Sequence, residues 1–237
     1  AILLPAKLSA STGHGHDPAP ATPVGTHATP AGDGHSTPAP AGPSADEAMS
    51  RLVEGNARFV SGEPAHPRAD QARRCLTFAD GQHPYVTVLS CADSRVPPEL
   101  LFDAGIGDLF VIRVAGNVAD TDEIATIEYG VGHLHTPLVV VLGHTRCGAV
   151  TAVCEGGELH GHLAELLDNV KPPVEQVKRQ HPALKGAPLV SAAVRANVNQ
   201  SIRDLLTRSP EIAALVRAGK VKVVGAIYDL HSGEVEF

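Results

Sequence analysis

Two features that this sequence lacks narrow the classes of protein to which it can belong. Its apolar runs, such as Leu138 to Leu142, are far shorter than the roughly 20 residues that a membrane-spanning helix needs. Its lysines and arginines are dispersed and the formal net charge is -7, so it has no basic patch of the kind that binds nucleic-acid phosphates. We therefore expect no membrane span and no nucleic-acid partner.

Cysteine is also scarce, with four residues in 237. Four cysteines in a chain of this length do not form a disulfide framework, and no Cys-x-x-Cys pair indicates thioredoxin-like redox chemistry. We interpret Cys75 and Cys154 as ordinary buried thiols, with a disulfide between them in an oxidising compartment as the alternative. Cys91 and Cys147 belong to patterns of another kind.

Residues 1–43 are rich in Pro, Ala, Gly, Thr and Ser and contain almost no large apolar residue after Leu8. Such a segment cannot bury enough apolar surface to offset chain entropy, so we expect a disordered tail. Its histidines are irregularly spaced, and we place no metal site there. The apolar residues before Leu8 resemble the end of a signal peptide, which favours a secreted or periplasmic protein; a cytoplasmic protein with an arbitrary chain start is the alternative.

One folded domain is expected over residues 44–237. It begins with Ser44-Ala-Asp-Glu47, a Ser-x-x-Glu capping box that predicts a helix over residues 45–61, ended by Gly62. Apolar residues at helical spacing predict further helices within 121–133 and 191–208. Short β-branched apolar runs predict strands at 85–90, 109–114, 138–142 and 221–228, the first three of them buried and parallel.

This alternation of strands and helices predicts an α/β fold, with a mostly parallel central β-sheet flanked by helices. In such sheets, ligands bind at the carboxyl ends of the strands. Cys91 follows the first predicted strand and His144 follows the third, so both side chains are expected at one edge of the sheet.

A third residue completes a pattern typical of a zinc site. His144 and Cys147 are three residues apart at the start of a predicted helix, where both can reach one ion. Each residue alone would more often be structural, but Cys91 adds a third soft or borderline ligand. Catalytic zinc sites typically have three protein ligands and a fourth position free for water, so we expect Zn²⁺ on Cys91, His144 and Cys147.

Several longer motifs surround these residues. Cys91-Ala-Asp-Ser-Arg95 has the form Cys-x-Asp-x-Arg, and it is followed by Gly107-Asp-Leu-Phe-Val-Ile-Arg-Val-Ala-Gly-Asn117, Ile127-Glu-Tyr129, Gly143-His-Thr-Arg-Cys-Gly148 and Tyr228-Asp-Leu-His-Ser-Gly233. In content and order these blocks resemble the β class of carbonic anhydrases. The resemblance extends over about residues 46–237.

The resemblance implies a zinc-dependent lyase that reversibly hydrates carbon dioxide to bicarbonate and a proton. Zinc-bound hydroxide would be the nucleophile, oriented by Asp93, which Arg95 would keep ionised and in one rotamer. At the family's substrate-binding positions, Gln82 would donate a hydrogen bond to the substrate, and Gly148 would begin a helix close to the metal. Phe110, Ala115 and Tyr129 would line a small apolar pocket, with ordinary core packing as the alternative for these three.

The resemblance also bears on the subgroup and the assembly. In one subgroup the aspartate closes the metal site, and Trp and Gly stand where this chain has Val88 and Ser90. The difference favours an open site with water on zinc and no non-catalytic bicarbonate pocket. A homodimer or a dimer of dimers is expected, with the 45–61 helix packed on a neighbouring subunit.

Two other functions remain open on the sequence. A hydrolase of carbon disulfide or carbonyl sulfide would share the scaffold and the zinc ligands, with a narrowed apolar entrance. A non-catalytic, zinc-stabilised binding protein would need neither Asp93 nor Arg95, and structural zinc sites normally fill all four positions with protein ligands. A cysteine phosphatase is excluded, because its Cys-x5-Arg loop needs arginine where Pro97 stands.

Overall fold

The computed structural model of the protein describes residues 42–157 and 160–237. The predicted tail over residues 1–43 and the resemblance to a signal peptide fall almost entirely outside the described residues. Within the described part, none of the helices has the length and apolar character that crossing a membrane requires.

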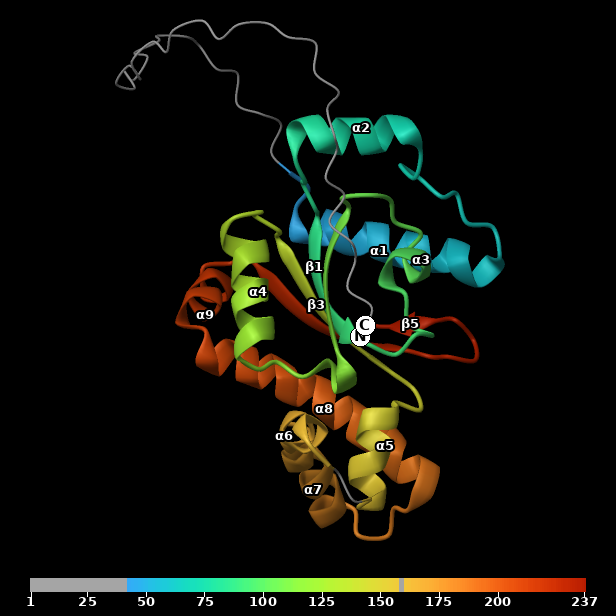
Figure 1. Ribbon diagram of the computed structural model, residues 1–237, viewed down its shortest axis with the longest axis vertical. Coiled ribbons are helices and arrows are strands. Elements are labelled where there is room, and N and C mark those ends of the chain that lie inside the picture. Colours follow the sequence, from blue (N-terminus) through green and yellow to red (C-terminus); the bar gives the residue numbers. More distant parts are fainter. Residues whose placement is uncertain (1–41, 158–159) are drawn as a thin grey trace, which may run out of the picture. The chain divides into compact units, whose positions relative to one another are not determined.

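Five strands form one sheet in the order β2-β1-β3-β4-β5 (Figure 1). Four of them are parallel and lie within two residues of the predicted strands: β1 (Val86–Cys91), β2 (Leu109–Val114), β3 (Leu138–His144) and β4 (Lys222–Tyr228). The fifth, β5 (Val235–Glu236), pairs with β4 in the antiparallel direction. The predicted α/β class with a mostly parallel sheet is therefore confirmed.

The two central strands place residues of the metal pattern at the same edge of the sheet. β1 and β3 are buried along their whole length, and they end at Cys91 and His144. The sequence predicts a buried β2 as well, and this prediction is wrong, because its residues are half-buried or exposed. β2 lies at an edge of the sheet and has a neighbouring strand on one side only.

Helix α1 (Ala45–Ser61) covers one face of the sheet together with the short α3 (Pro98–Leu101). The predicted capping box is present: the Glu47 N–H donates to Ser44 Oγ over 3.2 Å, and the Ser44 N–H donates to the Glu47 carboxylate over 2.7 Å. Gly62 ends the helix in a left-handed conformation, as expected.

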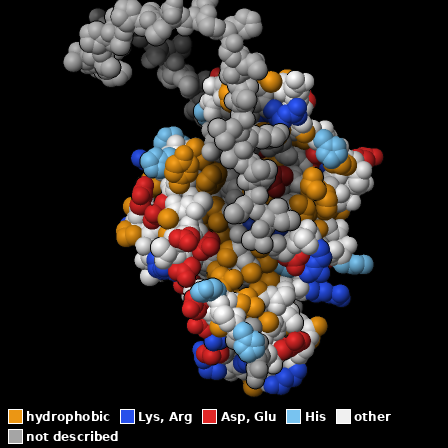
Figure 2. Space-filling view, in the orientation of Figure 1, with side chains coloured by type: hydrophobic (Ala, Val, Ile, Leu, Met, Phe, Trp, Pro, Cys, Tyr) orange, Lys and Arg blue, Asp and Glu red, His pale blue; other side chains and the backbone are white. Residues whose placement is uncertain are grey.

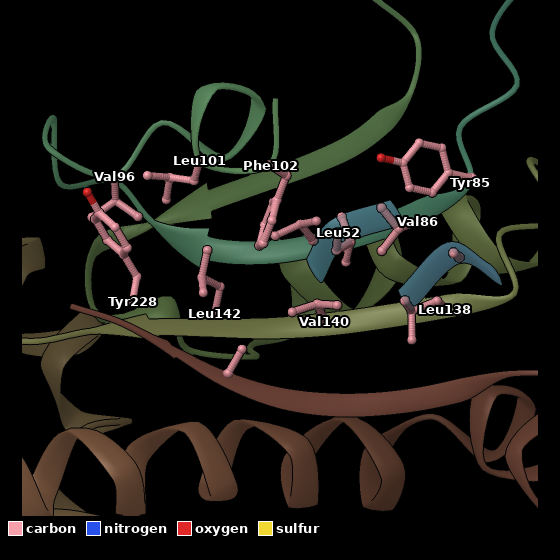
Figure 3. Packing of buried hydrophobic residues seen from close by; sticks show 13 residues of the cluster. Leu52, Tyr85, Val86, Val96, Leu101, Phe102, Leu138, Val140, Leu142 and Tyr228 are labelled. Atoms are coloured by element: carbon pink, nitrogen blue, oxygen red, sulfur yellow. The ribbon is translucent and has the colours of Figure 1, made fainter. Parts of the chain in front are cut away.

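The apolar side of α1 is buried within its own chain. Figure 3 shows Leu52 among side chains of the sheet and of the segment after β1, in a cluster that includes Val86, Val140 and Phe102. The sequence also predicts that this helix packs on a neighbouring subunit, and this stays a prediction for its other side, where Val53 is 50% and Val60 is 41% exposed. The even-numbered residues of β3 direct their apolar side chains to this face of the sheet, and α1 packs over them and excludes water.

Gly55 sets how closely α1 approaches α3, because an added Cβ would lie 1.9 Å from the carbonyl oxygen of Phe102. That oxygen belongs to the backbone and cannot rotate away. Gly55→Ala is expected to lower the free energy of unfolding by about 3 kcal/mol or somewhat less, the range of overpacked core sites. Urea unfolding would measure it, with Gly157→Ala as the control, since a Cβ there meets no atom within 4 Å. Equal losses in the two variants would contradict the packing argument.

The opposite face of the sheet is covered by three helices, α4 (Thr121–Gly132), α8 (Gly186–Arg208) and α9 (Pro210–Arg217), which bury the odd-numbered apolar residues of β3. The predictions for 121–133 and 191–208 are confirmed, although α8 begins five residues earlier than its apolar pattern indicates. Helices therefore flank both faces.

A second group of helices lies beyond the carboxyl ends of the strands (Figure 1). It consists of α5 (Gly148–Glu155), α6 (His162–Asp168) and α7 (Lys171–Gln180), which pack with α8 around a third apolar cluster. Cys91 and Cys147 belong to that cluster, so the site has a buried apolar side.

Helix α2 (Gln71–Asp80) has no buried residue. Phe78 is 93% exposed and Leu76 is 50% exposed, which is unusual for apolar side chains of this size. Cys75 is exposed on the same helix, so its interpretation as a buried thiol is wrong; Cys154 in α5 is half-buried. Both thiols are free, and no disulfide joins them.

Candidate metal centre

Cys91, His144 and Cys147 meet at the carboxyl edge of the sheet. Cys91 and His144 are the last residues of β1 and β3, and Cys147 is the N-cap residue of α5, after a turn in which Arg146 has a φ of 55°. One donor atom from each of the three lies within 4.8 Å of the other two, and all three residues are buried. The structure thus brings together the three ligands expected from the sequence.

The ring of His144 is oriented for binding a metal. Its Nδ1 lies 2.9 Å from the carbonyl oxygen of Thr145, so Nδ1 carries the proton and donates. Its Nε2 is buried and has no hydrogen-bond partner among the described residues. A buried, unpaired ring nitrogen is costly in a protein interior, and a metal ligand typically gives its other N–H to a carbonyl in this way. The site therefore fits a metal ion on Nε2.

The pKa values of the two cysteine thiols are shifted in opposite directions. The Cys147 thiol donates to the Cys91 sulfur, and this hydrogen bond is the largest cause of a lowered pKa at Cys91. Hydrogen bonds from the backbone N–H groups of Gly116 and Asp93 act in the same direction. The pKa of Cys147 is raised, first because its thiol gives that hydrogen bond and then because it is buried. A zinc ion needs both sulfurs as thiolates and would replace the proton of the Cys147 thiol.

Asp93 and Arg95 form the expected ion pair beside the three ligands. Arg95 donates from Nε to Oδ1 over 2.9 Å and from Nη2 to Oδ2 over 2.7 Å, and its backbone N–H donates to Oδ1 over 3.0 Å. These bonds hold the pKa of the Asp93 carboxyl well below its usual range, so the group is ionised at neutral pH. Asp93 Oδ2 is 3.8 Å from His144 Nε2, which places the carboxylate next to the position of a metal.

Sequence reasoning missed one residue that shapes this loop. Arg113 of β2 donates from Nε to the carbonyl oxygen of Cys91 over 3.0 Å and from Nη2 to that of Asp93 over 2.6 Å. It thereby fixes the backbone between the first ligand and the aspartate. Its signal in the sequence is a charged residue inside an otherwise apolar strand, which is rare unless the charge has partners.

Two of the five predicted pocket positions lie close to the Cys/His/Cys group, Ala115 through its neighbour Gly116 and Gly148 through its neighbour Cys147. Ala115 begins the short 3-10 turn η1 (Ala115–Asn117), whose Gly116 N–H donates to Cys91 Sγ over 3.4 Å. Gly148 is the first residue of α5, directly after Cys147, and a Cβ there would meet no atom within 4 Å. Both positions are compatible with an open space beside the metal.

The other three, Gln82, Phe110 and Tyr129, lie at the opposite end of the sheet. Phe110 is paired with Thr87, four residues before Cys91, which corresponds to roughly 13 Å along the strand. The Tyr129 ring packs on Phe110 with 5.9 Å between centroids, and exposed Gln82 precedes β1 altogether. Within one chain, these side chains are therefore not near the metal group.

Phe110 and Tyr129 belong to an aromatic group at the surface of the protein. Tyr129 is 47% exposed and its ring also packs on that of His133, with 5.1 Å between centroids. Figure 2 shows apolar side chains at the surface beside the C-terminal end of α4, the part of the helix that contains Tyr129. An exposed aromatic group of this kind is typical of a surface that meets another molecule.

The sheet, the flanking helices and a Cys/His/Cys group at the strand ends define a metalloenzyme of the α/β class. Residues 86–235 match the family model described as carbonic anhydrase. The chain is 39% identical to a carbonic anhydrase of Mycolicibacterium smegmatis over 193 residues, which cover 80% of this chain and 91% of that protein. It is 38% identical to carbonic anhydrase 2 of Mycobacterium tuberculosis over 190 residues, covering 78% and 89%.

Solved structures agree with these sequences. The β-carbonic anhydrase CcaA aligns with a TM-score of 0.63 and 32% identity, covering 79% of this chain and 86% of that one. One of two tetrameric β-carbonic anhydrases from Sordaria macrospora aligns with a TM-score of 0.62 and 27% identity, covering 79% and 94%. The chain belongs to the carbonic anhydrase family, in its β class, as the sequence motifs indicate.

Proposed function

We propose that this chain catalyses the reversible hydration of carbon dioxide to bicarbonate and a proton, with zinc held by Cys91, His144 and Cys147. The observation that carries the proposal is the buried, unpaired Nε2 of His144 among two cysteine sulfurs, in a chain of this family. When bound, zinc supplies a Lewis acid that makes hydroxide available from water near neutral pH, as established for carbonic anhydrases with three histidine ligands.

The roles of Asp93 and Arg95 follow from their geometry. Arg95 occupies both carboxylate oxygens of Asp93, which keeps the group ionised and in one orientation. Oδ1 accepts two hydrogen bonds from Arg95, whereas Oδ2 accepts one and keeps a lone pair. Oδ2 would therefore accept a hydrogen bond from the nucleophile and aim it at carbon dioxide. Because the carboxylate is held by Arg95, we propose an open metal site, consistent with Val88 and Ser90 in place of Trp and Gly.

The direct test combines metal analysis with stopped-flow hydration of carbon dioxide by the purified full chain. We expect about one zinc per chain, loss of activity on chelation, and recovery when zinc is returned. Zinc without hydration activity would indicate the non-catalytic binding protein instead. Faster turnover of carbon disulfide or carbonyl sulfide than of carbon dioxide would indicate the hydrolase.

We further propose that the active form is a homodimer or a dimer of dimers in which one copy supplies the metal group and another supplies Gln82, Phe110 and Tyr129. Three observations support it: these residues lie far from the metal in their own chain, α2 buries no residue, and a similar Sordaria macrospora protein is described as tetrameric. Phe78 and Leu76 give the second copy an apolar surface to cover.

A complementation experiment tests this sharing. Gln82→Leu and Cys147→Ser are each expected to be inactive or nearly so. In a hybrid dimer, however, the intact metal group of the first variant meets the intact Gln82 of the second. Because half of the dimers are hybrids with one complete site each, co-expression should restore roughly a quarter of wild-type activity. If Gln82 acted within its own chain, no hybrid would contain a complete site and nothing would be restored.

A further inference from the structure

The backbone turn beside Cys91 has an unusual conformation. Gly116 and Asn117 are both left-handed, with φ values of 78° and 46°. Gly adopts this region freely, and Asn tolerates it better than most residues but still at a cost, so Asn117 needs support from its surroundings. The turn is what directs the Gly116 N–H at Cys91 Sγ, so whatever holds the turn also holds this hydrogen bond.

Two side chains of α8 supply that support. Asn197 donates from Nδ2 to the carbonyl oxygen of Gly116 over 2.7 Å, and Ser201 donates from Oγ to that of Asn117 over 2.9 Å. The two residues are four apart on one side of the helix, and both are almost fully buried. Only the amide nitrogen can donate to a carbonyl, which fixes the orientation of the Asn197 side chain.

The contribution of Asn197 to the stability of the fold does not explain why an asparagine is buried at this position. Its Oδ1 is buried without a hydrogen-bond partner among the described residues, so half of the amide is left unsatisfied. Asn56 is a useful contrast, because its Nδ2 donates to two carbonyls and its Oδ1 accepts the Val235 N–H. Asn56 is satisfied and structural, whereas the one bond that Asn197 makes through its side chain is directed at the turn beside Cys91.

We propose that Asn197 is a positioning residue of the metal centre: by holding the Gly116 carbonyl, it keeps the Gly116 N–H on the Cys91 sulfur. Two thiolates give a metal more negative charge than neutral imidazoles would, and a hydrogen bond to a ligating sulfur withdraws part of that charge. Asn197 therefore adjusts the electron density at a metal that it does not touch. This inference rests on the proposed zinc site.

Cobalt(II) substitution gives a readout that does not depend on activity. Asn197→Leu removes the donor without adding a charge and nearly keeps the volume. With the hydrogen bond weakened, the Cys91 sulfur becomes more electron-rich, and the sulfur-to-cobalt charge-transfer band should move to longer wavelength at unchanged metal content. With zinc, kcat should fall about tenfold at pH 7 and recover at higher pH. Purely structural damage would lower kcat equally at every pH.

Asn56→Leu is the matched control, since it removes a buried amide whose hydrogen bonds go to Leu101, Gly233 and Val235 instead of to the turn beside Cys91, and it should leave the band in place. An unshifted band and pH profile in folded, metal-loaded Asn197→Leu would overturn the inference, and so would an equal shift in Asn56→Leu. If Asn197→Leu does not fold, Ser201→Ala decides in the same way, with a smaller shift expected. A shifted band in a protein without hydration activity would sustain the inference and refute the proposed function.

Discussion

Cys147→Ser protein is expected to contain much less than one zinc per chain and to lose hydration activity to the level of the buffer. The substitution leaves Cys91 and His144 as the protein ligands, and a serine hydroxyl is a weak zinc ligand at neutral pH. The nearest other ligating group of the described chain is the Asp93 carboxylate, whose Oδ2 lies 3.8 Å from His144 Nε2, and Arg95 holds both of its oxygens, which opposes a replacement of the lost thiolate. Elemental analysis after gel filtration measures the loss.

Cys154→Ser is the control for this experiment. Cys154 lies seven residues further on, within α5, and is half-buried, but it does not belong to the metal group. It should keep about one zinc per chain. Full zinc occupancy in Cys147→Ser would mean that the ligand assignment is wrong, whatever the activity.

Asp93→Asn should reduce hydration by about 10²- to 10⁴-fold while zinc stays bound, the usual contribution of a general-base or orienting group. Asparagine keeps the shape of the side chain but loses the charge that pairs with Arg95 and accepts a hydrogen bond. Because Arg95 holds the pKa of Asp93 below its usual range, the carboxylate is charged throughout the neutral range. The ratio of the wild-type rate to the variant rate should therefore stay constant between about pH 6 and 9. It should decrease only in strong acid, where Asp93 itself becomes protonated and uncharged.

Glu236→Gln is a matched control for the loss of a charge. Glu236 also forms a two-bond pair with an arginine, Arg195, at the surface and outside the metal group. It should hydrate carbon dioxide at the wild-type rate. Near wild-type activity in Asp93→Asn would remove its role in the mechanism, and a structure at neutral pH with the Asp93 carboxylate on zinc would refute the open site.

The helices and strands that could be predicted from the sequence are those marked by a pattern of residues within the element itself. The capping box at Ser44 fixes the start of α1, and continuous β-branched runs fix β1 and β3, because burial on both faces demands them. The metal group follows, since parallel strands end at one edge and Cys91 and His144 stand at two of those ends. By contrast, α2 buries no residue within its own chain. Its sequence therefore lacks the regular spacing of core residues from which a helix can be predicted.

Long-range contacts account for most of what could not be predicted. Asn197 and Gly116 are 81 residues apart, and nothing in the local sequence of α8 indicates that its buried amide faces the turn after β2. The position of Gln82 is different. Gln82 precedes a six-residue strand of which Cys91 is the last residue, and an extended strand cannot bring its two ends together, so this separation is implicit in the sequence.

The placement of Gln82, Phe110 and Tyr129 at the far end of the sheet has a consequence for how the protein behaves at low abundance. If each site is completed by a neighbouring copy, dilution below the dissociation constant of the dimer abolishes catalysis without unfolding any chain. Turnover per molecule would then rise with protein concentration. A copy that lacks Gln82 would inactivate the site of its healthy neighbour, whereas its own metal group, completed by that neighbour, would stay active. In a cell that makes both versions in equal amounts, roughly half of the sites would remain active, and a healthy copy could carry an inactive site.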